Sequence, residues 1–172
     1  LPGNTPSMMI NAGIHHPDGI ILDLEDSVAP GKKQEARILV RNALCGIDFY
    51  GAERMVRINK IPEGLNDLSY IVPYNVHVIL VPKCEHPEDI RQLEKEIDKI
   101  KPEGDEEGDI FFMPIIESAL GVERSFDIAV SSKKIVALAL GLEDLTADLG
   151  VERTEEGNES LYARQRIVNA CK

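Results

Sequence analysis

The stretch IILDLEDSVAPGKKQEARILVRNAL, residues 20–44, contains the structural unit that the rest of the chain repeats. It opens with an apolar run that does not alternate with polar residues, which is typical of a parallel strand buried on both faces. A turn with Pro and Gly follows. From Lys32 to Leu44, apolar residues then recur at helical spacing. The stretch therefore predicts a strand followed by an amphipathic helix, the unit of α/β folds.

The same order of elements recurs along the chain. We predict strands near residues 20–24, 54–58, 77–82, 110–116 and 135–141. We predict helices over 32–44, 87–100, 118–130 and 158–170, a surface loop over the acidic stretch KPEGDEEGD at 101–109, and a loop then a helix over 150–164. Strand, helix and strand in succession indicate right-handed βαβ units in a parallel sheet.

We expect an α/β fold, a (β/α)8 TIM barrel that is incomplete in this chain, with about five to six of the eight units. Residues 1–172 are expected to form one truncated barrel domain. A closed barrel takes about 250 residues, and LPGN at the start resembles the end of another strand, so a longer polypeptide is expected. The alternative is an open doubly wound sheet, although the chain has no GxGxxG or GxxxxGK[ST] phosphate loop.

Composition excludes several classes of partner and site. The net charge of -11, from 30 acidic and 19 basic residues, argues against nucleic acid and an anionic membrane. The three cysteines have no paired spacing, so neither a disulfide framework nor a zinc site is indicated, and a reducing cytoplasm fits best. No apolar run approaches the roughly 20 residues of a membrane span.

Charged side chains follow each predicted strand, at the point where the strand ends. In chain order they are Glu25 and Asp26, Arg57, Lys83, Glu117, and Asp144. The carboxyl ends of barrel strands converge on one mouth, where barrel enzymes place their active sites. We therefore expect these charges to share one pocket, and we infer a metal-dependent enzyme that acts on an anionic substrate.

Glu117 and Asp144 are the candidate metal ligands, because they follow consecutive strands and would be neighbours at the mouth. Mg²⁺ prefers oxygen donors and is often held by one or two carboxylates together with water and substrate. The alternative is that each acid caps the helix that follows it, since acids favour helix N-termini. Ser118, directly after Glu117, is also a natural cap.

Arg57 and Lys83 are the candidate cations of the site. A guanidinium binds carboxylates bidentately, so Arg57 suits a di- or tricarboxylate substrate, while a structural ion pair with Glu25 or Asp26 is the alternative. Lys83 could form a Schiff base, as in barrel aldolases. Neighbouring carboxylates should instead keep its pKa high, so we expect an ion-pair or hydrogen-bond partner within the site.

Three acids lie at the end of the first predicted strand. Adjacent residues of an extended chain point to opposite sides, so only one of Glu25 and Asp26 is expected to face the pocket directly. Asp23 is expected to face the interior as well, where it could orient Arg57 or a metal-bound water. Cys84 has no histidine placed to activate it, and we predict a structural role.

Seven motifs in a fixed order resemble one known family. They are PGN at 2–4, DLEDSVAPGKKQEAR at 23–37, VRIN at 56–59, VPK at 81–83, PIIES at 114–118, ALGLEDLTADLGVERT at 139–154 and SLYAR at 160–164. Together they resemble the citrate lyase β-subunit family, within the wider group of Mg²⁺-dependent acyl-CoA lyases and aldolases. The resemblance covers essentially the whole chain.

The resemblance implies a TIM barrel that cleaves a citryl thioester into oxaloacetate and an acetyl thioester. It implies that Glu117 and Asp144 bind Mg²⁺ and that Arg57 binds the substrate and offsets its charge. Glu25, Asp26 and Lys83 are then further catalytic residues. Pro2, Gly3 and Asn4 are expected to lie near the acyl-thioester arm.

The resemblance also implies partners. They are a citryl thioester on acyl carrier protein or CoA, further copies in a trimer or hexamer, and the citrate lyase α subunit with its acyl carrier protein. The family's last two strands and a lid that supplies a catalytic acid to a neighbouring subunit have no counterpart in these residues, so activity is expected to need further chain. Alternatives are a citramalyl-CoA or malyl-CoA lyase, a hydroxy-oxo-acid aldolase, and a non-catalytic carrier-binding subunit.

Overall fold

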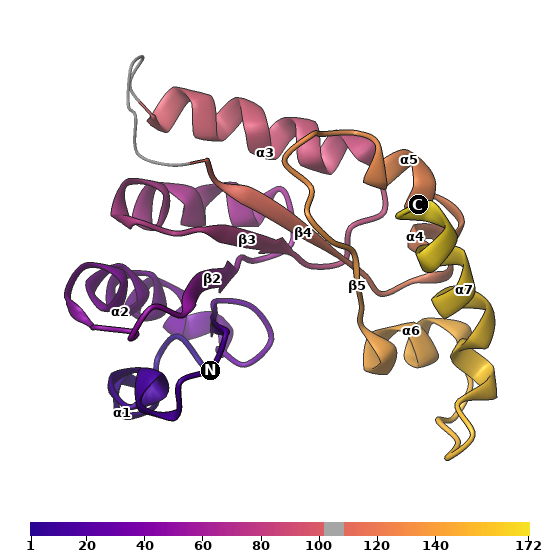
Figure 1. Cartoon of the computed structure of the whole chain (residues 1–172), viewed down its shortest axis with the longest axis horizontal. Coiled ribbons are helices and arrows are strands. Elements are labelled where there is room, and N and C mark those ends of the chain that lie inside the picture. The colour runs from indigo at the N-terminus through magenta and orange to yellow at the C-terminus, as the bar shows by residue number, and fades with distance from the viewer. Residues whose placement is uncertain (102–108) are drawn as a thin grey trace.

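The computed structural model describes residues 1–101 and 109–172. Five parallel strands lie side by side in chain order and form an open half-barrel in this part of the chain (Figure 1). They are β1 (Gly19–Asp23), β2 (Glu53–Arg57), β3 (Val78–Val81), β4 (Phe111–Ile116) and β5 (Ala139–Leu140). The α/β class and the parallel order are as predicted. Most of the acidic loop expected at 101–109 lies outside the described residues.

Helices and short 3-10 turns connect the strands. They are α1 (Pro6–Ile10), η1 (Ala12–His15), η2 (Pro30–Lys32), α2 (Lys33–Gly46), η3 (Glu63–Tyr70), η4 (Val72–Tyr74), α3 (Pro87–Ile100), α4 (Ala119–Glu123), α5 (Ser125–Ala129), α6 (Leu142–Leu149), η5 (Asn158–Ser160) and α7 (Leu161–Ala170). Figure 1 shows the chain passing from α1 at one edge of the sheet to α6 and α7 at the other. None of the helices in the described ranges is long and apolar enough to cross a membrane.

The helix predicted at 87–100 is α3, and its bounds are confirmed. Pro87 occupies the first turn, where its missing N–H is not needed. His86 and Asp89 form a reciprocal capping box at the same end. The buried residues Ile90, Leu93 and Ile97 repeat at helical spacing and pack into the core.

The predictions were less accurate after β4. The strand expected at 135–141 is reduced to Ala139–Leu140, with one isolated bridge from Ile135 to Phe112. The helix expected at 118–130 is two short helices, α4 and α5, which meet at Arg124. We did not predict α6, which begins directly after Gly141 and ends at Gly150 in the left-handed conformation. Asp144 therefore lies in the first turn of a helix rather than at a strand end.

Alternate residues of the strands face two different environments. Leu22, Val56, Ile79 and Phe112 point outward and are buried against the helices in the main core. The opposite side, here called the inner face, carries a smaller cluster of Val78, Leu80 and Ile115, with Met55, Met113 and Ala139 against it. This alternation follows from the two-residue period of a strand, and it decides which charged residue of each strand end faces inward.

The inner face of the sheet is more exposed to solvent than expected. The continuous apolar runs predict strands that are buried on both faces. Ile21 of β1 remains 39% exposed, whereas its neighbour Leu22 on the outer face is 1% exposed. The reason is that the five strands form an open sheet in the described residues, so the inner face of the edge strand lacks an opposing strand.

The first residues run parallel to β1, as the LPGN motif suggested. Asp23 donates its backbone N–H to the carbonyl of Leu1, and Gly3 donates to the carbonyl of Asp23 at 2.7 Å. Pro2 and Asp23 form a parallel bridge. The segment Pro2–Asn4 therefore lies at the carboxyl end of β1.

Candidate metal and substrate site

Asp23 and Arg57 lie directly opposite each other at the ends of β1 and β2. The guanidinium donates from Nε to Oδ1 and from Nη2 to Oδ2 of Asp23, both at 2.7 Å. Nη1 of Arg57 lies 3.2 Å from Oε2 of Glu25. This fork geometry holds the plane of the guanidinium fixed. The structure confirms that Asp23 orients Arg57, and it shows the ion pair with Glu25 that was weighed as an alternative.

The charges shift the pKa of both partners. Burial alone would raise the pKa of Asp23, but the hydrogen bonds from Arg57, Ser27 and the backbone lower it to about 2. The same hydrogen bond with Asp23 raises the pKa of Arg57 above its usual value. Both groups are therefore charged across the physiological pH range.

Lys83 contacts the residues that follow β1 and β4 and the first turn of α6. Its φ of 50° is uncommon for a residue other than glycine. Its backbone N–H donates to Oε2 of Glu117 at 2.8 Å. Its Nζ lies 2.7 Å from Oε1 of Glu25, 3.2 Å from Oδ2 of Asp26 and 3.4 Å from Oδ2 of Asp144. One residue, through its backbone and its side chain, thus contacts four of the other predicted site residues, Glu25, Asp26, Glu117 and Asp144.

One expectation about this group was wrong. Both Glu25 and Asp26 reach Lys83, although adjacent residues of a strand would diverge. The reason is that β1 ends at Asp23, so these acids belong to the turn that follows and not to extended chain. Burial alone would lower the pKa of Lys83, but the bonds to Glu25 and Asp26 raise it above its usual value. The expectation of a high pKa is confirmed.

Glu117 is a carboxylate that is largely removed from solvent, with 8% of its surface exposed. Burial raises its pKa, the Lys83 N–H opposes this rise, and the negative charges of Asp144 and Glu25 add to it. Gly141 provides the room for the side chain, because a Cβ there would lie 2.3 Å from Oε1 of Glu117. A buried carboxylate near other carboxylates is stabilised by a nearby cation.

A cavity of about 300 Å³ opens beside these groups. It is lined by Lys60, Lys83, Glu85, Glu117, Ser118, Asp144, Ala147 and Asp148. Four carboxylates and two ammonium groups leave two negative charges, which one divalent cation would neutralise. No three His, Cys, Asp or Glu side chains of the described chain form a ready metal cluster. Mg²⁺ commonly takes one or two carboxylates and fills its octahedron with water and substrate. The oxygen donors of Glu117 and Asp144 therefore fit it.

Comparison with known proteins agrees with the motifs. Residues 1–172 match the sequence model of the family described as HpcH/HpaI aldolase/citrate lyase. The chain belongs to this family. It is 40% identical to citrate lyase subunit beta of Leuconostoc mesenteroides subsp. cremoris and 38% identical to that of Escherichia coli strain K12, in each case over all of the chain and 58% of the relative. It is 29% identical to the mitochondrial citramalyl-CoA lyase of Homo sapiens, over 54% of that protein.

Solved structures of family members share the fold. The citrate lyase beta subunit of Mycobacterium tuberculosis, solved with oxaloacetate and magnesium, superposes with a TM-score of 0.77 at 25% identity, over 99% of this chain and 70% of that one. CitE from the same organism, solved with magnesium, acetoacetate and coenzyme A, gives 0.78, over 99% of this chain and 59% of that one. The chain spans a little over half the length of the curated citrate lyase subunits that it matches.

The alternative that the acids act as helix caps is only partly supported. Ser118 is the N-cap of α4 and accepts from Gly121, and Asp148 accepts the N–H of Ala119. These two residues cap α4, so Glu117 is not needed there. Asp144 does lie in the first turn of α6, where a negative charge is favourable. Asp144 also lines the cavity and its side chain is partly exposed, so a place in the first turn of α6 is compatible with binding a cation.

Three residues that matter to this site were not singled out from the sequence. Lys60 and Asp148 line the cavity, and Gly141 leaves space for Glu117. A signal existed for Lys60, which is the next charged residue after the VRIN motif. No signal in the sequence indicated Gly141, because no helix was predicted after it and only the register of β4 and β5 shows what it faces.

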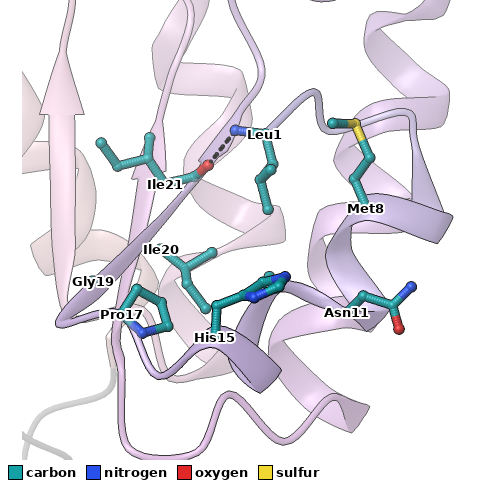
Figure 2. A pocket seen from close by; sticks show the side chains of 9 residues that line it. Leu1, Met8, Asn11, His15, Pro17, Gly19, Ile20 and Ile21 are labelled. Atoms are coloured by element: carbon teal, nitrogen blue, oxygen red, sulfur yellow. Dashed lines mark hydrogen bonds between the residues drawn. The ribbon is translucent and has the colours of Figure 1, made fainter.

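A second, larger cavity of about 530 Å³ lies at the outer edge of β1. Figure 2 shows that it is lined by the apolar side chains of Leu1, Met8, Ile20 and Ile21, with His15 at one side. No carboxylate lines it, so it lacks the donors of the family's candidate metal site. The predicted active site therefore stays with the smaller cavity.

Proposed function

We propose that this chain carries the Mg²⁺-binding part of a carbon–carbon lyase that cleaves a citryl thioester into oxaloacetate and an acetyl thioester. The observation that carries the proposal is a cavity with excess negative charge that is lined by Glu117, Asp144 and Lys83. Arg57 lies outside the lining of this cavity and is linked to Lys83 through Glu25, which contacts both cations. Similarity over the whole chain to citrate lyase beta subunits supports it. Because these residues cover 58% of those relatives, the activity belongs to the complete protein.

The proposal includes the fold of that protein. We infer that residues 1–172 form one domain and supply about five to six units of a (β/α)8 TIM barrel. The parallel strand order and the charged carboxyl ends support this inference.

Glu117 and Asp144 would hold the metal, with remaining positions for water and substrate oxygens. When bound, Mg²⁺ supplies Lewis acidity toward the hydroxyl and carboxylate oxygens of the substrate. Lys83 would hold Glu117 through its backbone and Asp144 through its side chain, so the spacing of the two acids depends on it.

Arg57 would offset the negative charge that develops on the thioester. In the reaction the hydroxyl proton leaves, the carbon–carbon bond breaks toward the acetyl unit, and its electron pair forms a thioester enolate. That carbon then takes a proton, and oxaloacetate departs. A fixed cation aimed at developing charge contributes on the order of 3 kcal/mol. Asp23 and Glu25 fix Arg57 in advance.

The carrier would approach along the N-terminal segment. Pro2, Gly3 and Asn4 lie beside Asp23, next to the charged groups, which supports a place near the acyl-thioester arm. We propose CoA or an acyl carrier protein as the carrier, a homotrimer or homohexamer as the assembly, and the α subunit as a further partner. A cytoplasmic location belongs to the same proposal.

The test is release of oxaloacetate from citryl-CoA by the full-length protein, coupled to malate dehydrogenase. We expect release that requires Mg²⁺, is abolished in Glu117→Gln, and is retained in Glu96→Gln, a surface substitution on α3 where Glu96 pairs with Lys99. Cleavage of citramalyl-CoA or malyl-CoA alone would keep the chemistry and replace the substrate. No cleavage together with no Mg²⁺ binding would overturn the lyase and favour a carrier-binding subunit.

A further inference from the structure

The two cations named from the strand ends are already engaged by protein carboxylates. Arg57 contacts Asp23 and Glu25, and Lys83 contacts Glu25, Asp26 and Asp144. An additional anionic group on the substrate would have to compete with these acids. A further cation at the cavity would avoid that competition.

Lys60 is such a cation. Its side chain lines the same cavity as Glu117 and Asp144. Within residues 1–101 and 109–172, its ammonium has no hydrogen bond or ion pair, in contrast to that of Lys83, which lines the same cavity. The ammonium is therefore available to a ligand that enters the cavity.

The backbone that carries Lys60 is held rigidly. Its neighbours Asn59 and Ile61 are buried, at 4% and 9% exposure. The carbonyl of Lys60 accepts the N–H of Gly64 at 3.0 Å. Gly64 allows this close turn, because a Cβ there would lie 2.1 Å from the carbonyl oxygen of Asn59.

Buried polar groups fix this turn from beneath. Oδ2 of Asp67 accepts both the backbone N–H and the side-chain Nδ2 of Asn59, at 2.7 and 2.9 Å. Oδ1 of Asp67 accepts Nε of Arg37 at 2.6 Å. Asp67 is completely buried. The backbone at Lys60 is thus fixed, while its long side chain is free to extend toward a ligand in the cavity.

The candidate substrates differ by one charged group. A citryl thioester has a CH₂–COO⁻ arm on the hydroxyl-bearing carbon where a citramalyl thioester has a methyl group. The products differ in the same way, since oxaloacetate has a second carboxylate that pyruvate lacks. The metal would bind the hydroxyl or keto oxygen and the adjacent carboxylate. The CH₂–COO⁻ arm would then remain for another cation to bind.

We propose that Lys60 binds the second carboxylate of the substrate and so selects oxaloacetate-yielding over pyruvate-yielding thioesters. The inference rests on the proposed lyase function and names the specificity residue of that site. An ammonium is a compact point charge suited to a single carboxylate. If Lys60 were instead a surface lysine that binds no ligand, the protein would not distinguish oxaloacetate from pyruvate through it. Selectivity between these two ligands therefore separates a specificity role from a purely structural one.

The test is titration of oxaloacetate and of pyruvate into the full-length protein with saturating Mg²⁺, by calorimetry. In Lys60→Met we expect the dissociation constant of oxaloacetate to rise at least about tenfold and that of pyruvate to change less than about twofold. Lys60→Arg keeps the charge and should retain most of the oxaloacetate affinity. Lys95→Met, on the exposed side of α3, should match the wild type.

The failures of the two proposals are distinguishable. Wild-type binding of Mg²⁺ and oxaloacetate with no change in Lys60→Met would overturn the role of Lys60 and leave the lyase standing. An equal loss of oxaloacetate and pyruvate binding would also overturn it, because the effect would then be general electrostatics. A wild-type protein that binds neither Mg²⁺ nor oxaloacetate would overturn both.

Discussion

Gly141 leaves open the space that the Glu117 carboxylate occupies. An added methyl group at Gly141 would lie 2.3 Å from Oε1 and 2.6 Å from Cγ of Glu117. The two residues continue the register in which Ile116 of β4 pairs with Leu140 of β5. The position of a candidate metal ligand on one strand therefore depends on the absence of a side chain on the next.

Gly141→Ala should displace Glu117 and damage the metal site. We expect Mg²⁺ affinity to fall at least about tenfold and stability to fall by about 1–3 kcal/mol, because overpacking forces neighbouring groups to move. Gly46→Ala is the matched control, since a Cβ at Gly46 meets nothing within 4 Å. Calorimetry and urea unfolding on both variants measure the two effects. Unchanged Mg²⁺ affinity in Gly141→Ala would contradict the assignment of Glu117.

The pair of Asp23 and Arg57 should make stability depend on acidic pH. The pKa of Asp23 is about 2 in the folded chain, against an ordinary value of 3.8. A lowered folded pKa stabilises the protein above pH 4, and this contribution is lost as the pH falls through 2. The difference corresponds to about 2 kcal/mol. We expect Asp23→Asn to lose that pH-dependent part.

Urea unfolding between pH 6 and pH 2 measures this difference. Asp98→Asn on the exposed side of α3 serves as the control and should follow the wild-type curve. A wild-type curve parallel to that of Asp23→Asn over the whole range would show that the pair adds no pH-dependent stability.

Lys83 should not form a Schiff base. Its pKa is raised by the carboxylates around its Nζ, so the ammonium form persists at neutral pH and has no lone pair for attack. We expect borohydride with oxaloacetate or pyruvate to give no covalent adduct by mass spectrometry, and a lysine-dependent aldolase should give one in parallel. A mass increase that disappears in Lys83→Met would refute this assignment.

Asp67 should be important for stability. It accepts hydrogen bonds from Arg37 and from both nitrogens of Asn59, without solvent exposure. Breaking a buried charge pair costs about 3–5 kcal/mol. We expect Asp67→Asn to lose about 3 kcal/mol in thermal or urea unfolding, with little change in Asp98→Asn. A loss below about 0.5 kcal/mol would mean that the turn carrying Lys60 is held by other contacts.

The sequence predicted the fold best where apolar periodicity was strong. The runs at 20–24, 54–58 and 110–116 correspond to strands within about one residue, and α3 begins and ends as predicted. It failed at 135–144, because the run IVALALGLED has no polar residue before Glu143 and reads as one strand. Only two residues of this run hydrogen-bond to β4 as a strand. Glu143 and Asp144 lie in the first turn of α6 instead.

The site was predicted as a set of charges but not as a geometry. Strand ends identified Arg57, Lys83 and Glu117, because the carboxyl ends of parallel strands meet. Which acid pairs with which base could not be read from one chain. The pairing of Asp23 with Arg57 follows from the register of β1 and β2. The contacts of Lys83 join residues as far apart in the chain as Glu25 and Asp144.

The most direct test of the central claim is Mg²⁺ titration of the full-length protein by calorimetry, with Glu117→Gln and Glu96→Gln in parallel. We predict one Mg²⁺ per chain in the wild type and in Glu96→Gln, and at least about tenfold weaker binding in Glu117→Gln, because an amide oxygen replaces a charged ligand. Equal Mg²⁺ affinity in all three proteins, or no Mg²⁺ binding in the wild type, would contradict a metal site at Glu117 and Asp144.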